Sequence, residues 1–199
     1  MTTAAVLPGV ESLTSLLRAP DVSCAALAAF LDGLDEPARV RAVRTLPGRA
    51  LRRLWTVCAN AAPLSLDEFV PPTLAEGETL IYAGKNSLPL FSIFEKRFAR
   101  HRGEIVGYNE GTTRPLVGPG YFTVSAPPDR PREVLIDYER VPATAPAGWP
   151  AVKPNDRGLS ALVFGHLHDY LRRVSNGVVI GIGTRHGKDL NAWFVLARG

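Results

Sequence analysis

Residues 178–197, VVIGIGTRHGKDLNAWFVLA, decide the fold. Both ends of this stretch are rich in valine, isoleucine, leucine and aromatic residues, which favour strands. Between them, residues 185–189 combine glycine with polar side chains, which is typical of a hairpin loop. The glycine spacing is G-x-G-x-x-x-G and a strand follows it, whereas a dinucleotide-binding loop needs G-x-G-x-x-G followed by a helix. The stretch therefore predicts an antiparallel hairpin.

Upstream, glycine, proline, asparagine and aspartate again separate short apolar segments, which predicts further strands. They span residues 80–83, 104–108, 116–125 and 133–138. Two segments instead place their apolar residues on one helical arc, which predicts helices over 88–102 and 159–174. Because so few helices connect so many strands, a parallel sheet is disfavoured. We expect an α+β fold with a curved antiparallel β-sheet or partly open barrel and two packed helices.

The N-terminal part has a different pattern. Residues 9–18, 24–34, 35–45 and 49–61 read as helices, with Asp21 or Ser23 as the cap of the second helix and Asp35 as the cap of the third. Prolines interrupt the next segment, in which residues 66–70 allow one helical turn. The expected organisation is a helical segment over 1–62, a connector over 63–79 and an antiparallel β-rich domain over 80–199.

Composition restricts the classes of function. The chain has 199 residues and a formal charge of +4, but only four of its 23 cations are lysines, a bias typical of bacterial high-GC coding. Six arginines between residues 39 and 53 accompany no DNA-reading motif, so the sequence does not point to nucleic acid as a partner. The two cysteines lack metal-ligand spacing, and no signal peptide or membrane span is evident. The sequence predicts a cytoplasmic protein and nominates no metal site and no cofactor.

Six side chains are candidates for ligand binding, namely Arg97, Tyr108, Tyr121, Asp137, His166 and Tyr170. Arg97 falls inside the apolar arc of the predicted helix 88–102 and needs either a carboxylate partner such as Asp137 or an anionic ligand. His166 lies inside the arc of helix 159–174, with Tyr170 one turn later and Asp169 at its edge. Tyr108 and Tyr121 adjoin glycines that could admit a ligand to the backbone.

These residues support three functional hypotheses. The first is a non-catalytic binding module whose internal cavity holds a small apolar or carboxylate ligand. The second is an interaction or scaffold protein that docks a protein partner through residues 9–60. The third is an enzyme that uses His166 with Tyr170 or Asp169, for which the spacing of acids and bases gives less support.

Overall fold

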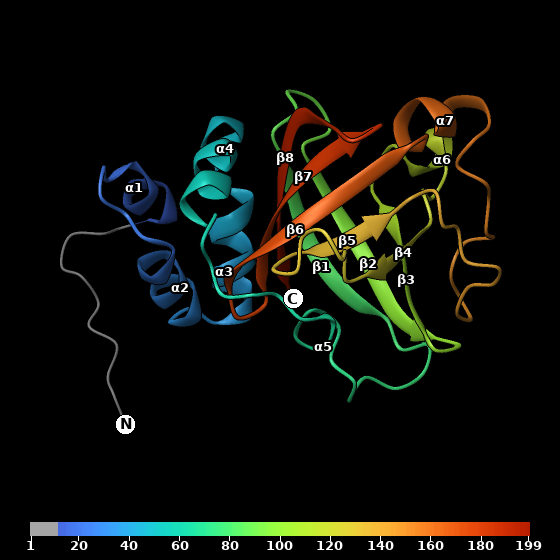
Figure 1. Ribbon diagram of the computed structural model, residues 1–199, viewed down its shortest axis with the longest axis horizontal. Helices are drawn as coiled ribbons and strands as arrows, with labels where there is room; N and C mark the ends of the chain where they lie inside the picture. Colours follow the sequence, from blue (N-terminus) through green and yellow to red (C-terminus); the bar gives the residue numbers. More distant parts are fainter. Residues whose placement is uncertain (1–11) are drawn as a thin grey trace.

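A computed structural model describes residues 12–199, in which eight antiparallel strands close into a barrel flanked by helices (Figure 1). Each strand pairs with the next along the chain, and the last pairs with the first. The strands are β1 (Leu80–Asn86), β2 (Ile93–His101), β3 (Glu104–Glu110), β4 (Phe122–Ser125), β5 (Val134–Asp137), β6 (Leu167–Ser175), β7 (Val178–Arg185) and β8 (Lys188–Arg198). The hairpin predicted from residues 178–197 is formed by β7 and β8.

The expectation of an α+β fold with an antiparallel sheet is confirmed, but the expectation of a partly open barrel is wrong. Strand β8 is long enough to pair with β7 along one side and with β1 along the other. The β1–β8 ladder runs from the pair Tyr82 and Arg198 to the pair Asn86 and Phe194. Closure leaves no unpaired strand edge to be protected.

The two helices expected to pack on the sheet are mostly strands. Residues 93–101 form β2, and only Gly158–Phe164 of the second segment is helical (α7) before β6 begins. In β2 the residues Phe94, Lys96 and Phe98 share the inner face, because alternate residues of a strand point the same way. Phenylalanines four residues apart fit a helical arc equally well, which explains the wrong prediction.

Glycines opposite phenylalanines let large rings fold into the barrel. Gly181 is the cross-strand partner of Phe194, and Gly107 is that of Phe122. A Cβ atom on Gly181 would lie 2.3 Å from Cζ of Phe194, so only glycine leaves room for the ring. Gly84 stands in the same relation to Phe94. Each phenylalanine ring therefore fills interior space that a side chain on the facing glycine position would otherwise occupy.

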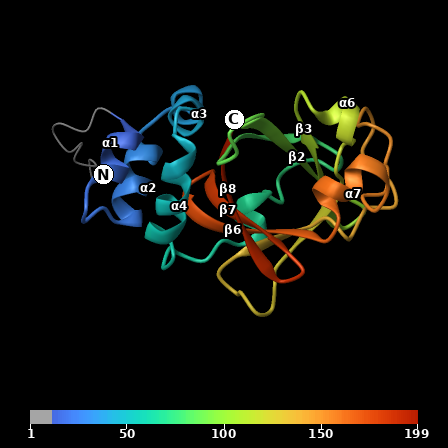
Figure 2. The same ribbon diagram turned by 90° about the horizontal axis from the view of Figure 1, so that it is seen from above.

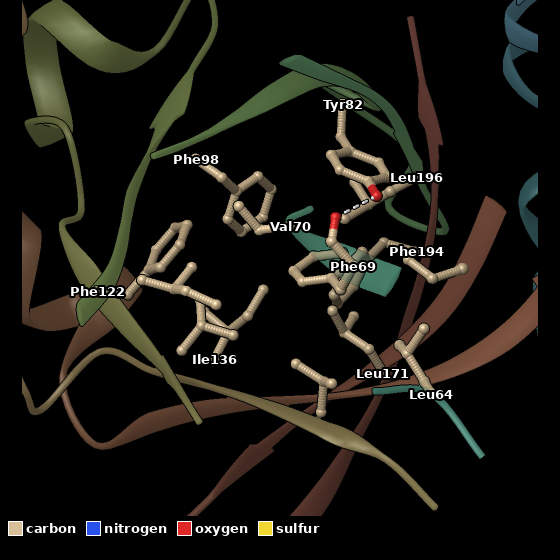
Figure 3. Packing of buried hydrophobic residues seen from close by; sticks show 14 of the residues in the cluster. Leu64, Phe69, Val70, Tyr82, Phe98, Phe122, Ile136, Leu171, Phe194 and Leu196 are labelled. Atoms are coloured by element: carbon tan, nitrogen blue, oxygen red, sulfur yellow. Dashed lines mark hydrogen bonds between the residues drawn. The ribbon is translucent and has the colours of Figure 1, made fainter. Parts of the chain in front are cut away.

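One end of the barrel is closed by the segment that the sequence predicts as a connector. It contains α5 (Leu66–Phe69), the helical turn expected there, whose N-terminus is closed by a capping box of Ser65 and Glu68. Phe69 and Val70 are fully buried, and the Phe69 ring packs edge-on against Phe98, 4.8 Å away. Figure 3 shows Phe69 among the barrel residues, with the Tyr82 hydroxyl donating to its carbonyl oxygen at 2.8 Å. We call Leu64–Val70 the plug.

The N-terminal helices cover the outside of β6, β7, β8 and β1 (Figure 2). They are α1 (Leu13–Arg18), α2 (Cys24–Asp32), α3 (Glu36–Arg44) and α4 (Gly48–Val57), close to the expected ranges; the start of the first lies outside the described residues. Ser23 and Asp35 cap α2 and α3 as expected, accepting hydrogen bonds from Ala26 N and Ala38 N. A second core forms where leucines of these helices meet Val178, Ile180 and Val195.

The remaining connections cover the other side of the barrel. Two short helices, α6 (Arg114–Val117) and α7, lie beside each other at the end opposite the plug (Figure 1). The proline-rich residues 142–154, which we call the strap, contact the barrel through Trp149, whose Nε1 donates to Thr79 Oγ1 at 2.8 Å. In the part of the chain described, no helix has the length and apolar character needed to cross a membrane.

Candidate functional site

The barrel end opposite the plug opens into a cavity of about 710 Å³. Phe94 and Phe194 form part of its wall, and α6 and α7 flank its mouth through Val117 and Phe164. Most of the exposed large hydrophobic residues in the described chain surround this mouth. They are Leu88, Leu90, Phe91, Ile93, Leu116, Val163 and Leu190. An apolar cavity with an apolar mouth is the usual form of a site for a small hydrophobic molecule.

Three polar side chains, Lys96, Asn109 and Asp169, line this cavity, and the buried Tyr138 hydroxyl hydrogen-bonds to them. We call these four residues the polar floor. Lys96 Nζ lies 3.1 Å from Asp169 Oδ2 and donates to Asn109 Oδ1 at 2.8 Å. It also contacts the Tyr138 hydroxyl, which donates to Asp169 Oδ2 at 3.2 Å. The ammonium group therefore has a partner for each of its three protons.

Aromatic rings surround the lysine of the polar floor. Lys96 Nζ lies 5.1 Å from the ring centres of Phe122 and Tyr138, and 5.2 Å from that of Phe194. Such contacts favour a cation because the face of an aromatic ring is electronegative. They offset part of the free energy lost when the ammonium leaves water.

Burial changes the proton affinities of the polar floor. Desolvation lowers the pKa of Lys96 and raises that of Asp169, while the attraction between the two charges opposes both shifts. Desolvation and the neighbouring Asp169 charge raise the pKa of the Tyr138 hydroxyl well above its ordinary value. Tyr138 therefore remains a neutral hydrogen-bond donor across the physiological pH range.

The polar floor retains an acceptor that can serve a ligand. Oδ2 of Asp169 binds Lys96 and Tyr138, whereas no described residue donates a hydrogen bond to Oδ1. A Cβ atom on Gly183, which lines the cavity, would lie 3.5 Å from this oxygen. The opposite charges of Lys96 and Asp169 cancel, so the floor presents hydrogen-bonding groups with no net charge.

None of the six residues proposed from the sequence lines this cavity. Arg97 lies on the outer face of β2, where it pairs with Glu95 at 3.2 Å and contacts the Tyr108 hydroxyl at 3.4 Å. The expected inward position of Arg97 is wrong because strand alternation turns its neighbour Lys96 inward instead. Tyr108 and Tyr121 are buried under the strap, against Trp149.

The other three candidates lie on or beside the outer faces of β5 and β6. Asp137 contacts His168, and His166 Nδ1 lies 2.7 Å from Glu139 Oε1. The His166 side chain is 60% exposed, so the expected inward position is wrong here too, since residue 166 lies in the turn between α7 and β6. The guanidinium of Arg130 lies over the Tyr170 ring, with its central carbon 3.8 Å from the ring centre. Ligand binding by these six residues stays a prediction.

Of the polar floor, the sequence points only to Asp169, and there only as a partner for His166. Two signals could have found Lys96. It is one of four lysines in an arginine-rich chain, and a two-residue period places it between Phe94 and Phe98. Asn109 and Tyr138 give no comparable signal, because the register of the β2–β3 ladder places Asn109 opposite Lys96, and the arrangement of the whole barrel brings in Tyr138.

No protein-family model, curated protein or solved structure matches this chain significantly.

Proposed function

We propose that this protein binds one small, mainly apolar molecule in the open end of the barrel. The observation that supports the proposal best is the cavity of about 710 Å³, with hydrophobic side chains at its mouth and a buried polar floor. Eight-stranded barrels have an interior wide enough for one small ligand. The volume lies within the range of sites for such molecules.

The charge balance of the floor favours a neutral ligand with a hydroxyl or carbonyl head. Lys96 is already neutralised by Asp169, and Arg97, the basis for expecting an acidic ligand, lies outside the cavity. A ligand hydroxyl could donate to Asp169 Oδ1, while the apolar remainder would contact Phe94 and Phe194. An ionised carboxylate would have to leave water without gaining a free cation.

Fluorescence titration of the purified full-length protein with the neutral apolar dye N-phenyl-1-naphthylamine tests the proposal. We expect saturable binding of one dye per chain, and displacement by dodecanol at lower concentration than by dodecanoate. Tighter binding of dodecanoate would contradict a neutral head group. Absence of dye binding, together with no co-purified molecule in native mass spectrometry, would contradict the cavity site.

A cavity-filling variant provides the matched comparison. Gly183 has room for a side chain, since its nearest neighbours would lie 3.5 Å or more from an added Cβ atom. Gly183→Phe should weaken dye binding at least about tenfold, which corresponds to about 1.4 kcal/mol. Ala126→Phe, at an exposed position that does not line the cavity, should leave binding unchanged.

The two other hypotheses from the sequence have less support. In residues 12–62 every large hydrophobic side chain is at least partly covered, so those helices present no exposed apolar stripe for a protein partner. His166 is solvent-exposed and lines a separate hollow of about 490 Å³, and neither Tyr170 nor Asp169, its expected catalytic partners, lines that hollow with it.

A further inference from the structure

A second group of side chains lies outside the barrel, where β5 and β6 pair. It contains Asp137, Glu139 and His168, and we call it the outer cluster. His166 adjoins it, and the His186 ring lies 4.4 Å from that of His166. Imidazole and carboxylate groups are the ligands preferred by Zn²⁺ and similar divalent ions.

The spacing within the outer cluster fits a bound metal ion. His168 Nε2 lies 3.2 Å from Asp137 Oδ1 and 3.3 Å from Glu139 Oε2. One possible ligand atom from each residue lies within 4.8 Å of the others. In a tetrahedral zinc site with bonds of about 2.0–2.1 Å, neighbouring ligand atoms lie about 3.3 Å apart. A small inward adjustment would allow all three to contact one ion.

The backbone and a neighbouring histidine hold these ligands in place. Asp137 and His168 are cross-strand partners in the β5–β6 ladder. The amides of Glu139 and Arg140 donate to Asp137 Oδ1 at 2.8 and 3.3 Å. His166 Nδ1 lies 2.7 Å from Glu139 Oε1, which leaves Oε2 directed toward His168. Hydrogen-bonded partners of this kind orient metal ligands in known sites.

The charge of the outer cluster also favours a cation. Neither Asp137 nor Glu139 forms an ion pair with a lysine or arginine among the described residues, although the chain has 23 such cations. At a pH where the histidines are neutral, two adjacent carboxylates therefore lack a permanent counter-charge. Solvent reaches the cluster, since Glu139 is 46% exposed and lines a hollow of about 490 Å³.

We propose that Asp137, Glu139 and His168 bind a divalent transition-metal ion, with Zn²⁺ as the best fit, and that His166 positions Glu139. Water would complete the coordination, because three protein ligands leave a fourth tetrahedral position. The site is separate from the barrel cavity and does not depend on the function proposed for it.

The test uses the full-length protein after treatment with a chelator. Isothermal titration with Zn²⁺ should give one site per chain, and Co²⁺ should produce the visible absorption of a tetrahedral complex. His168→Ala and Asp137→Asn should each weaken Zn²⁺ binding at least about 100-fold, and His166→Ala about tenfold. No heat and no Co²⁺ absorption with the unaltered protein would overturn the proposal.

His101→Ala is the matched control, because His101 contacts Glu76 and Thr144 in another part of the barrel. We expect this variant to bind Zn²⁺ as the unaltered protein does. Equal weakening by His101→Ala and His168→Ala would mean that binding is not at the outer cluster, and would also overturn the proposal. Thermal unfolding keeps the test valid if a variant folds poorly: Zn²⁺ should raise the Tm of the unaltered protein, and no rise would count against the site.

Discussion

Lys96 and Asp169 project from different strands into the barrel and are 2% and 5% exposed, respectively. Two opposite charges in such a place depend on each other, because removal of one leaves the other buried without compensation. We therefore expect the double substitution to lower the free energy of unfolding by less than the sum of the two single substitutions.

Asp169→Asn should lower the free energy of unfolding by about 3–5 kcal/mol, because it leaves the Lys96 ammonium without its anion. The double variant Lys96→Met with Asp169→Leu should lose less, since it removes both charges from the apolar interior. Urea denaturation followed by tryptophan fluorescence measures both values. A double variant as unstable as the sum of the Lys96→Met and Asp169→Leu single variants would show that the two residues are not coupled.

At the scale of single elements, the plug and the barrel mouth place phenylalanines in opposite environments. Phe69 in the plug is fully buried, whereas Phe91 at the mouth is 67% exposed. The same substitution should therefore affect different properties at the two ends.

Phe69→Ala should lower the free energy of unfolding by about 3–5 kcal/mol, as expected for loss of a buried ring. Phe91→Ala should change stability by less than about 0.5 kcal/mol but weaken binding of the apolar dye. Denaturation and dye titration on both variants separate the two effects. A large loss of stability in Phe91→Ala would mean that the mouth belongs to the folding core.

Strands β2 and β6 show why the sequence predicted only part of the fold. The capped helices and the β7–β8 hairpin have strong local signals, and the structure has them near the expected ranges. In β2 and β6, by contrast, a charged residue occupies an inner position, Lys96 in one and Asp169 in the other. Each interrupts the alternation of apolar and polar residues that identifies a strand. The residues that form the candidate site are therefore the ones that concealed the strands.

The outer cluster could be predicted only in part for a different reason. The sequence proposes Asp137 and His166 as ligand-binding residues, but it does not indicate that Glu139 and His168 lie beside them. Strand pairing alone places Asp137 opposite His168. Pairings between residues so distant along the chain depend on the whole barrel and leave no local pattern.

At the scale of the whole molecule, all five tyrosines share one electrostatic property. Burial raises the pKa of Tyr82, Tyr108, Tyr138 and Tyr170, and raises that of Tyr121 to about 12. Above pH 10, the unfolded chain loses tyrosine protons that the folded chain retains. Stability from these groups is therefore complete below pH 10 and declines as pH rises through the folded-state pKa values.

Spectrophotometric titration of tyrosinate should accordingly show little ionisation at pH 10 in the folded protein, with a steep rise on alkaline unfolding. Circular dichroism over the same pH range should report loss of structure together with that rise. Reversible ionisation near pH 10 of a tyrosine other than the half-buried Tyr170, with the fold intact, would contradict the buried environments of Tyr82, Tyr108, Tyr121 and Tyr138.

The plug has a consequence for the exchange of a bound molecule. Because Phe69 and Val70 seal one end of the barrel, the interior is blind-ended, and anything held there must depart through the opening by which it arrived. Residence time would then be governed by the hydrophobic lip and by α6 and α7. Substitutions in the lip should alter the rates of entry and departure together, whereas changes in the polar floor should act mainly on departure.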